Sequence, residues 1–171
     1  SHEIRTPMNA VIGMAEMALR EDLPPAARDY ITQIKASGKT LLTIINDILD
    51  FSKIESGKMN IIPVEYEPMS TIHDVANIIT TRIGSKNVEL ILDIAPDIPY
   101  KLFGDSIRFK QILLNLANNA VKFTKHGRVL LKIYADPVEN GETVLHASIE
   151  DTGIGIKKEH IGRLFRSFEQ L

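Results

Sequence analysis

Apolar side chains recur with a heptad rhythm in the first 57 residues, and this rhythm predicts two helices. The apolar and small positions, spaced alternately by three and four residues, are Ile4, Met8, Val11, Ala15 and Ala18, then Ile31, Ile34, Gly38, Leu41, Ile45, Ile48 and Ser52. Such spacing keeps one stripe in register along a helix, as in coiled coils and bundles. Residues 22–25 interrupt the rhythm with two prolines, and proline favours the first turn of a new helix. The pattern predicts a helical hairpin that ends at Ser56-Gly57.

One partner helix does not cover the whole apolar stripe of this hairpin. We therefore expect two hairpins to pair as a four-helix bundle in a homodimer. The alternative is a hairpin that packs only on the C-terminal part of its own chain. A monomer mass that does not change with concentration would exclude the dimer.

The remaining residues show a mixed pattern of short alternating and helical segments. Strands are expected at 59–66, 88–94, 129–135 and 143–151, and helices at 69–83, 105–124 and 157–170. Gly84 would close the first of these helices, and Asp105 or Ser106 would cap the second. Turns are expected at 126–127 and 139–141. Helices beside hairpin-linked strands predict a two-layer α/β sandwich.

Composition narrows the classes of protein that fit this pattern. The chain has 171 residues, 44% hydrophobic and 25% charged, which is enough to bury a core in one or two domains. A net charge of −2 gives no overall attraction to nucleic acid or to an anionic membrane. The absence of cysteine excludes disulfides, thiolate zinc sites and a cysteine nucleophile. No apolar run approaches the roughly 20 residues that span a bilayer.

The start of the chain has an unusual composition for a helix. His2 is followed by the carboxylate of Glu3, and Pro7 lies within the heptad pattern, where its ring should kink the helix. An imidazole can act as a nucleophile when one nitrogen is held by an acceptor and the other is open. The alternative is a solvated His-Glu pair on an exposed helix face.

The helix expected at 105–124 carries one narrow polar stripe. On a helical wheel Arg108, Gln111, Asn115, Asn119 and Lys122 lie together, while apolar residues fill most of the rest, so we expect this helix to be mostly buried. Cations neutralise phosphates, and asparagine carbonyls can bind Mg²⁺ without adding negative charge. The alternative is an ordinary solvent face, although such faces usually include acidic residues.

The strand at 143–151 ends in an aspartate followed by a glycine loop. Asp151 continues the face of Leu145, Ala147 and Ile149, so we expect it to be buried and to need a donor such as an adenine amine. Glycines at 153 and 155 would let the backbone approach a ring or a phosphate. Neither the dinucleotide fingerprint nor the P-loop is matched. Taken alone, the loop fits a plain turn better than a binding site.

In this order, the segments resemble the conserved boxes of sensor histidine kinases. Ser-His-Glu-Ile-Arg-Thr-Pro-Met-Asn at 1–9 resembles the H box, and Asn-Leu-Ala-Asn-Asn-Ala-Val-Lys-Phe-Thr at 115–124 resembles the N box. Asp-Thr-Gly-Ile-Gly at 151–155 resembles the first glycine box, and 164–170 resembles the F box. The wording of 46–55 is most similar to the hybrid subclass, which also carries receiver domains.

The resemblance implies phosphotransfer roles at the start of the chain. His2 would accept the γ-phosphoryl group of ATP through its distal nitrogen, and Glu3 would hold or deprotonate the other nitrogen. The phosphoryl group would then pass to an aspartate of a response-regulator receiver domain. Glu3 and Thr6 match the family's phosphatase pattern, in which Thr6 would position a water against the phosphoaspartate.

The same resemblance implies roles in binding ATP. Asn119 would bind Mg²⁺, and Asn115 and Lys122 would contact phosphates, with Arg108 added because it shares their stripe. Asp151 would bind the adenine amine in a pocket shaped by Gly153 and Gly155.

The expected organisation is a dimerisation and phosphotransfer domain at 1–57, followed at 58–171 by an ATP-binding sandwich shared with Hsp90-like and gyrase-like ATPases. The second glycine box, the loop that covers ATP and the last strands are absent, so we expect an internal, truncated fragment. Such a fragment should autophosphorylate barely, because positioning supplies most of phosphoryl-transfer catalysis. Robust labelling of His2 would overturn that expectation.

Two other functions compete with the kinase. One is a non-catalytic dimerising phosphotransfer module, and the other is an ATPase of the related fold without histidine chemistry. We expect a cytoplasmic segment of a membrane-anchored sensor, with no nucleic-acid partner and no membrane contact of its own.

Overall fold

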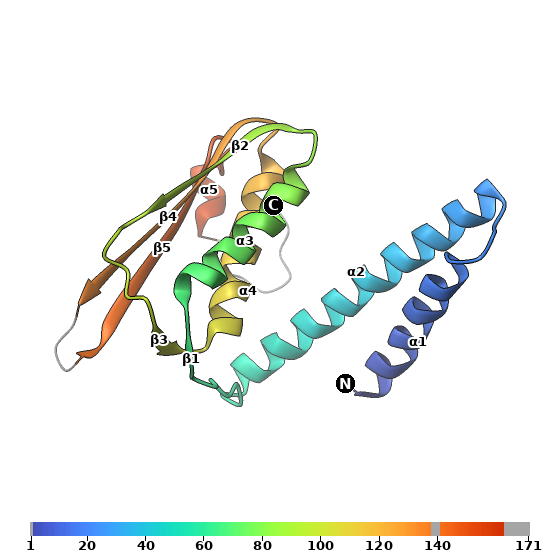
Figure 1. Cartoon of the computed structure of the whole chain (residues 1–171), viewed down its shortest axis with the longest axis horizontal. Coiled ribbons are helices and arrows are strands. Elements are labelled where there is room, and N and C mark those ends of the chain that lie inside the picture. The colour runs from blue at the N-terminus through green and yellow to red at the C-terminus, as the bar shows by residue number, and fades with distance from the viewer. Residues whose placement is uncertain (1, 138–140, 163–171) are drawn as a thin grey trace. The chain divides into compact units, whose positions relative to one another are not determined.

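The computed structural model describes residues 2–137 and 141–162, and the chain separates into two compact units, 1–61 and 62–171. In the first unit, α1 (His2–Ala18) and α2 (Pro25–Glu55) form an antiparallel hairpin (Figure 1). The predicted hairpin is confirmed, with Pro25 in the first turn of α2. Gly57 follows α2 with a φ of 63°. Pro7 lies inside α1, and the kink beside it remains a prediction.

Small residues let the two helices of the hairpin approach each other. Gly38 is buried, and a Cβ atom there would lie 3.0 Å from Cγ1 of Ile12. On the same hairpin Arg28 of α2 donates hydrogen bonds of 3.0 Å to the carbonyls of Leu19 and Glu21, which lie at the end of α1 and in the turn. The turn is therefore held by a side chain as well as by its prolines.

The second unit is a two-layer α/β arrangement, as predicted. Its elements are β1 (Val64–Tyr66), α3 (Pro68–Ile83), β2 (Asn87–Ile94), β3 (Leu102–Gly104), α4 (Ser106–Phe123), β4 (His126–Pro137), β5 (Thr143–Asp151) and α5 (Lys158–Ile161). Strands β1 and β3 pair antiparallel, and a second sheet has the order β2-β4-β5. Because β2 and β4 run parallel, the chain must cross over between them, and α4 makes part of that crossover. Helices α3 and α4 lie on one face of this sheet (Figure 1).

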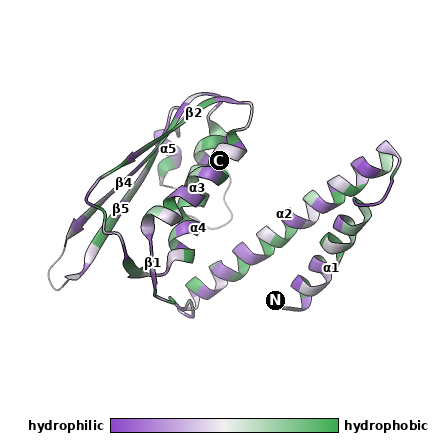
Figure 2. Ribbon diagram, viewed as in Figure 1, coloured by the Kyte–Doolittle hydropathy of each residue, from purple (hydrophilic) through white to green (hydrophobic). Residues whose placement is uncertain are grey.

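The core of the second unit lies between these helices and the sheet. Its fully buried side chains include Ile72, Val75, Ile79, Leu113, Val129, Leu131 and Ile133. Figure 2 shows the corresponding alternation of apolar and polar residues along α3 and α4. The layer is built by helix faces of period 3.6 packing on strand faces of period 2, as the sequence pattern predicted.

The expectation of a strand over 59–66 is wrong in extent, since β1 contains three residues. The amide of Ile62 donates to Oδ2 of Asp105 at 3.1 Å, and Pro63 has no amide proton, so neither residue can donate to a strand partner. The turn expected at 126–127 is also wrong. His126 and Gly127 pair with β2, and the chain turns at Thr124 and Lys125 instead.

Two further expectations fall partly outside the described residues. The turn at 139–141 includes undescribed residues 138–140, although β4 and β5 pair antiparallel as expected for a hairpin. The helix expected at 157–170 is described only as α5, and the F-box segment 164–170 lies outside the described residues.

Side chains accept or donate hydrogen bonds at both ends of α4. Asp105 is the N-cap, as one of the two predicted alternatives, and its Oδ1 accepts a hydrogen bond of 3.0 Å from the amide of Arg108. At the other end Lys86 Nζ donates to the carbonyl of Val121 at 2.9 Å, where a cation also complements the helix dipole. These contacts fix α4 before any ligand binds.

Replacing Asp105 by Ala should lower the melting temperature by a few degrees, because two amides lose their acceptor. Hydrogen bonds from the amides of Arg108 and Ile62 lower the pKa of Asp105. Its contribution to stability is therefore complete above the unfolded pKa of about 3.9 and is lost as pH falls through the lower folded pKa. Thermal melts of Asp105→Ala between pH 3 and pH 7 should show a smaller acid-dependent loss. An exposed control, Asp97→Ala, should melt like the unsubstituted chain; equal melting of Asp105→Ala at pH 7 would contradict the capping role.

Candidate active site

The polar stripe of α4 forms as predicted. Asn115, Asn119 and Lys122 are all exposed on this helix. Arg108 is half-buried and donates to Oε1 of Gln111 at 2.7 Å, so these two side chains already interact within the stripe. The structure thus presents two amides and a lysine to solvent along one line.

The expectation that α4 is mostly buried is wrong. Ile112, Leu116 and Phe123 are 58%, 50% and 45% exposed. One face of α4 packs on the sheet and α3, and no other described element covers the side that these three residues occupy. They lie next to Asn119 on the helical wheel, so an apolar strip flanks the polar stripe. Helical periodicity did not predict this strip, because by itself it assigns all apolar positions of a helix to the core.

The first glycine box places its aspartate differently from the prediction. Asp151 is exposed, and so is Ala147 on the same strand. The reason is that, among the described strands, β5 is at the edge of the sheet, and Asp151 is its last residue. Oδ1 of Asp151 accepts a hydrogen bond of 2.8 Å from the amide of Gly153, whereas Oδ2 has no hydrogen-bond partner among the described residues. One carboxylate oxygen is therefore oriented and the other can accept from a ligand.

Gly153 brings this loop against the end of α4. A Cβ atom at this position would lie 2.6 Å from the carbonyl oxygen of Phe123 and 2.7 Å from Oδ1 of Asp151. The amide of Ile154 donates to the same carbonyl at 3.3 Å. Gly155 has a φ of 67°. Gly153 therefore allows a close approach to the backbone of α4. Its approach to a ring or a phosphate remains a prediction. The structure joins the Asp151 loop to the helix that carries the polar stripe.

The candidate phosphotransfer residues lie in the first unit, on the first turns of α1. His2 begins α1, and the side chains of Glu3 and Thr6 are exposed. Arg5 Nη2 donates to Oδ1 of Asn46 on α2 at 3.0 Å, which ties this end of α1 to its neighbour. The structure thus groups His2, Glu3 and Thr6 on one short helical segment.

Two family models match the chain. Residues 1–57 match the "His Kinase A (phospho-acceptor) domain", and residues 104–170 match the "Histidine kinase-, DNA gyrase B-, and HSP90-like ATPase". The chain belongs to the sensor histidine kinases. The two matches include the H-box residues in the first unit and α4 with the first glycine box in the second.

Relatives of this histidine kinase chain include hybrid kinases. Hybrid signal transduction histidine kinase B of Dictyostelium discoideum is 40% identical over 171 residues, which are 100% of this chain and 9% of that protein. Signal transduction histidine-protein kinase BarA of Escherichia coli K12 is 39% identical over 99% of this chain and 18% of that protein. The chain therefore spans less than a fifth of these two relatives.

One solved structure is similar to this chain in fold. Full-length ShkA in complex with AMPPNP is 34% identical with a TM-score of 0.79, over 99% of this chain and 35% of ShkA. The family match and this likeness support a nucleotide-binding second unit.

The residues of the second unit fit a magnesium nucleotide in their chemistry. No cluster of three or more His, Cys, Asp or Glu side chains suited to a metal occurs among the described residues. Magnesium bound with a nucleotide instead takes few protein ligands beside waters and phosphate oxygens, and the exposed amide of Asn119 is a neutral oxygen donor of the right kind. Asp151 Oδ2 adds a hydrogen-bond acceptor. Gly153 packs closely against the end of α4 beside it.

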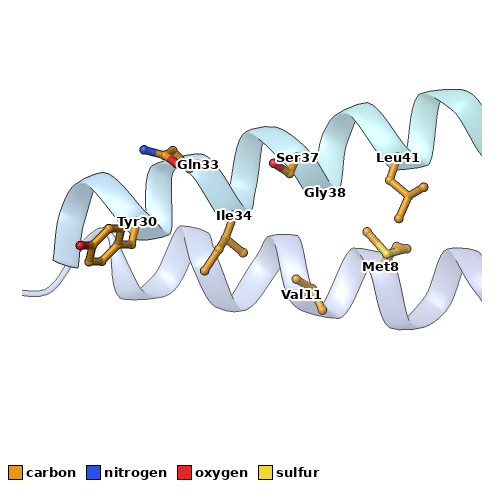
Figure 3. Close-up of a pocket in the computed structure, with 8 residues that line it drawn as sticks. All are labelled: Met8, Val11, Tyr30, Gln33, Ile34, Ser37, Gly38 and Leu41. Carbon is orange, nitrogen blue, oxygen red and sulfur yellow. The ribbon is translucent and has the colours of Figure 1, made fainter. Parts of the chain in front are cut away.

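The apolar stripe of the histidine kinase hairpin forms a groove. It has a volume of about 560 Å³, and Figure 3 shows its lining of Met8, Val11, Tyr30, Gln33, Ile34, Ser37, Gly38 and Leu41. Tyr30 and Ile34 are 66% and 50% exposed, and Val11 is 44% exposed.

Among the described helices, none combines the length and the apolarity that crossing a membrane requires.

Proposed function

We propose that this chain transfers the γ-phosphoryl group of ATP to His2 and then to an aspartate of a receiver domain. The main observation is that the loop of Asp151 is hydrogen-bonded to the end of α4, the helix with the exposed amides. Asp151 Oδ2 on this loop can still accept a hydrogen bond. Asp151 Oδ2 can accept the exocyclic amine of adenine, and Asn115 and Lys122 can contact phosphates along α4. Together these groups can bind one base and a row of phosphates, and a nucleoside triphosphate contains both.

The first transfer forms one bond and breaks another. One ring nitrogen of His2 attacks the γ-phosphorus, and the bond from that phosphorus to the β,γ-bridging oxygen breaks as ADP leaves. Glu3 holds the proton on the other ring nitrogen and raises the nucleophilicity of the imidazole. Bound Mg²⁺, held in part by Asn119, would neutralise charge on the phosphates. Arg108 lies on the same stripe and is proposed as a further phosphate contact.

We propose the division of labour along the chain as well. Residues 1–57 serve as the dimerisation and phosphotransfer domain, and residues 58–171 bind ATP through Asp151, Gly153 and Gly155 at the adenine end. Because ATP and receiver domains are cytoplasmic, the chain would act as a cytoplasmic segment of a membrane-anchored sensor. Thr6 lies one helical turn after Glu3, where the pair could position water against a phosphoaspartate, which supports a phosphatase activity toward the same receiver.

Nucleotide binding tests the second unit directly. Asp151→Asn keeps the shape of the side chain, but its amide nitrogen or its neutral oxygen replaces an oriented carboxylate. The affinity for a fluorescent ATP analogue should fall by about tenfold to a hundredfold, as for a lost hydrogen bond to a charged group. Asp93→Asn, an exposed aspartate on β2, is the matched control. Unchanged affinity of Asp151→Asn would contradict the adenine role.

We propose that a second copy of the same hairpin binds in the groove of the hairpin, which forms a homodimer. A four-helix bundle would bury Val11, Ile34 and Leu41, which a single hairpin leaves exposed. Ile34→Asp should weaken dimerisation by at least about tenfold, because an unpaired carboxylate would have to be buried. Sedimentation equilibrium over a range of concentrations measures this, and Ala36→Asp on the opposite side of α2 should remain dimeric. A concentration-independent monomer mass for the unsubstituted chain would exclude the dimer.

A further inference from the structure

The loop after β5 is hydrogen-bonded to the last residue of α4 and to β4. On one side the amide of Ile154 donates to the carbonyl of Phe123, the last residue of α4. On the other side Thr152 is bonded to the backbone of Arg128 in β4. Its Oγ1 accepts from the Arg128 amide at 2.9 Å and donates to the Arg128 carbonyl at 3.3 Å, and its own amide donates to that carbonyl at 3.2 Å. The short segment 152–154 is thus anchored at two places.

Gly127 makes the second anchor possible. Its φ is 117°, a conformation that residues with a side chain rarely adopt, although it lies within β4. A Cβ atom on Gly127 would overlap Oγ1 of Thr152 and would lie 3.3 Å from its Cβ atom. The glycine therefore leaves a notch in the strand, and the Thr152 hydroxyl lies in it.

We propose that Thr152 is a positioning residue for adenine recognition, acting through Asp151; this rests on the proposed function of Asp151. Asp151 directly precedes Thr152, and its Oδ1 is held by the amide of Gly153. With Thr152 bonded to Arg128 and Ile154 bonded to Phe123, the residues around Gly153 cannot turn independently. The direction of Asp151 Oδ2 and its spacing from the α4 stripe are therefore set before the nucleotide arrives, and this lowers the cost of ordering on binding.

Two substitutions distinguish the effect of the Thr152 hydroxyl from the effect of the branched shape of its side chain. Thr152→Val keeps the branched shape and removes the hydroxyl, whereas Thr152→Ser keeps the hydroxyl. The probes are ATP and purine riboside triphosphate, which lacks the exocyclic amine that Asp151 would bind. Competition of each with a fluorescent ATP analogue on the purified 171-residue chain gives the ratio of their affinities. This ratio measures the contact between the amine and Asp151, and a general loss of stability does not change it.

The unsubstituted chain and Thr152→Ser should both prefer ATP by about tenfold. Thr152→Val should bind ATP about tenfold more weakly and lose most of that preference. Thr81→Val is the matched control, because the Thr81 hydroxyl donates to the Asn77 carbonyl at 2.9 Å on α3 and its loss should leave the ratio unchanged. Amide hydrogen exchange adds a measurement without nucleotide, in which Arg128 should exchange faster in Thr152→Val than in Thr152→Ser.

The outcomes distinguish the two levels of the proposal. An unchanged ratio in Thr152→Val, or equal exchange of the Arg128 amide in both variants, would overturn the positioning role and leave the proposed function standing. No preference for ATP in the unsubstituted chain would overturn the adenine role of Asp151, and the role of Thr152 with it.

Discussion

Replacing His2 by Gln is expected to abolish formation of acid-labile, base-stable phosphate on this chain. An amide nitrogen has no available lone pair for attack on phosphorus, so no other atom at this position can replace the imidazole. Glutamine favours helices, and the position is the first residue of α1, so the hairpin should fold normally. The measurement is transfer of labelled phosphate from γ-labelled ATP, with alkaline and acid washes to assign the bond.

His73→Gln is the matched control, because His73 is an exposed histidine on α3 outside the H box. It should be labelled like the unsubstituted chain. Labelling that survives in His2→Gln would show that another residue accepts the phosphoryl group, and would contradict the assignment of His2.

Asn119→Ala should lower the rate of labelling by about a hundredfold or more, since phosphoryl transfer depends on positioning and charge neutralisation. Asn119 is exposed on α4, and alanine is the strongest helix former, so stability should be unchanged or slightly higher. The same variant separates a kinase from a pure phosphotransfer module. Labelling of His2 by phosphoramidate needs no nucleotide site and should proceed normally in Asn119→Ala.

Asn77→Ala, an exposed asparagine on α3, controls for the loss of an amide from a helix surface. It should keep the full rate with ATP. If Asn119→Ala also keeps the full rate, α4 does not hold the phosphates, and the phosphotransfer module or another nucleotide site becomes the better account.

Local periodicity explains why much of the fold could be predicted. The heptad spacing from Ile4 to Ser52 depends on neighbours within one or two turns, and it places both helices of the hairpin correctly. The asparagines of the candidate site were found for the same reason, because residues four apart share a helix face. The cap at Asp105 is also local, since its acceptor and the Arg108 amide are three residues apart.

Features that depend on distant contacts could not be predicted in this way. Gly127 was expected in a turn because glycine favours turns, whereas its conformation serves Thr152, which is 25 positions later and bonds Arg128. Ile112 and Leu116 are apolar but exposed, because burial depends on which elements cover a face of α4. Strand alternation predicts a buried Asp151, but it does not indicate that β5 lies at the edge of the sheet in the part of the chain that the structure describes.

Mass spectrometry can identify the residue that carries the transferred phosphoryl group. The chain is incubated with ATP carrying a labelled γ-phosphoryl group, digested at alkaline pH, and analysed by tandem mass spectrometry. Even at low stoichiometry, we predict label on His2 alone, with none detected in Asn119→Ala. Label on any other residue, or equal labelling of His2 when Asn119 is replaced by Ala, would contradict the account.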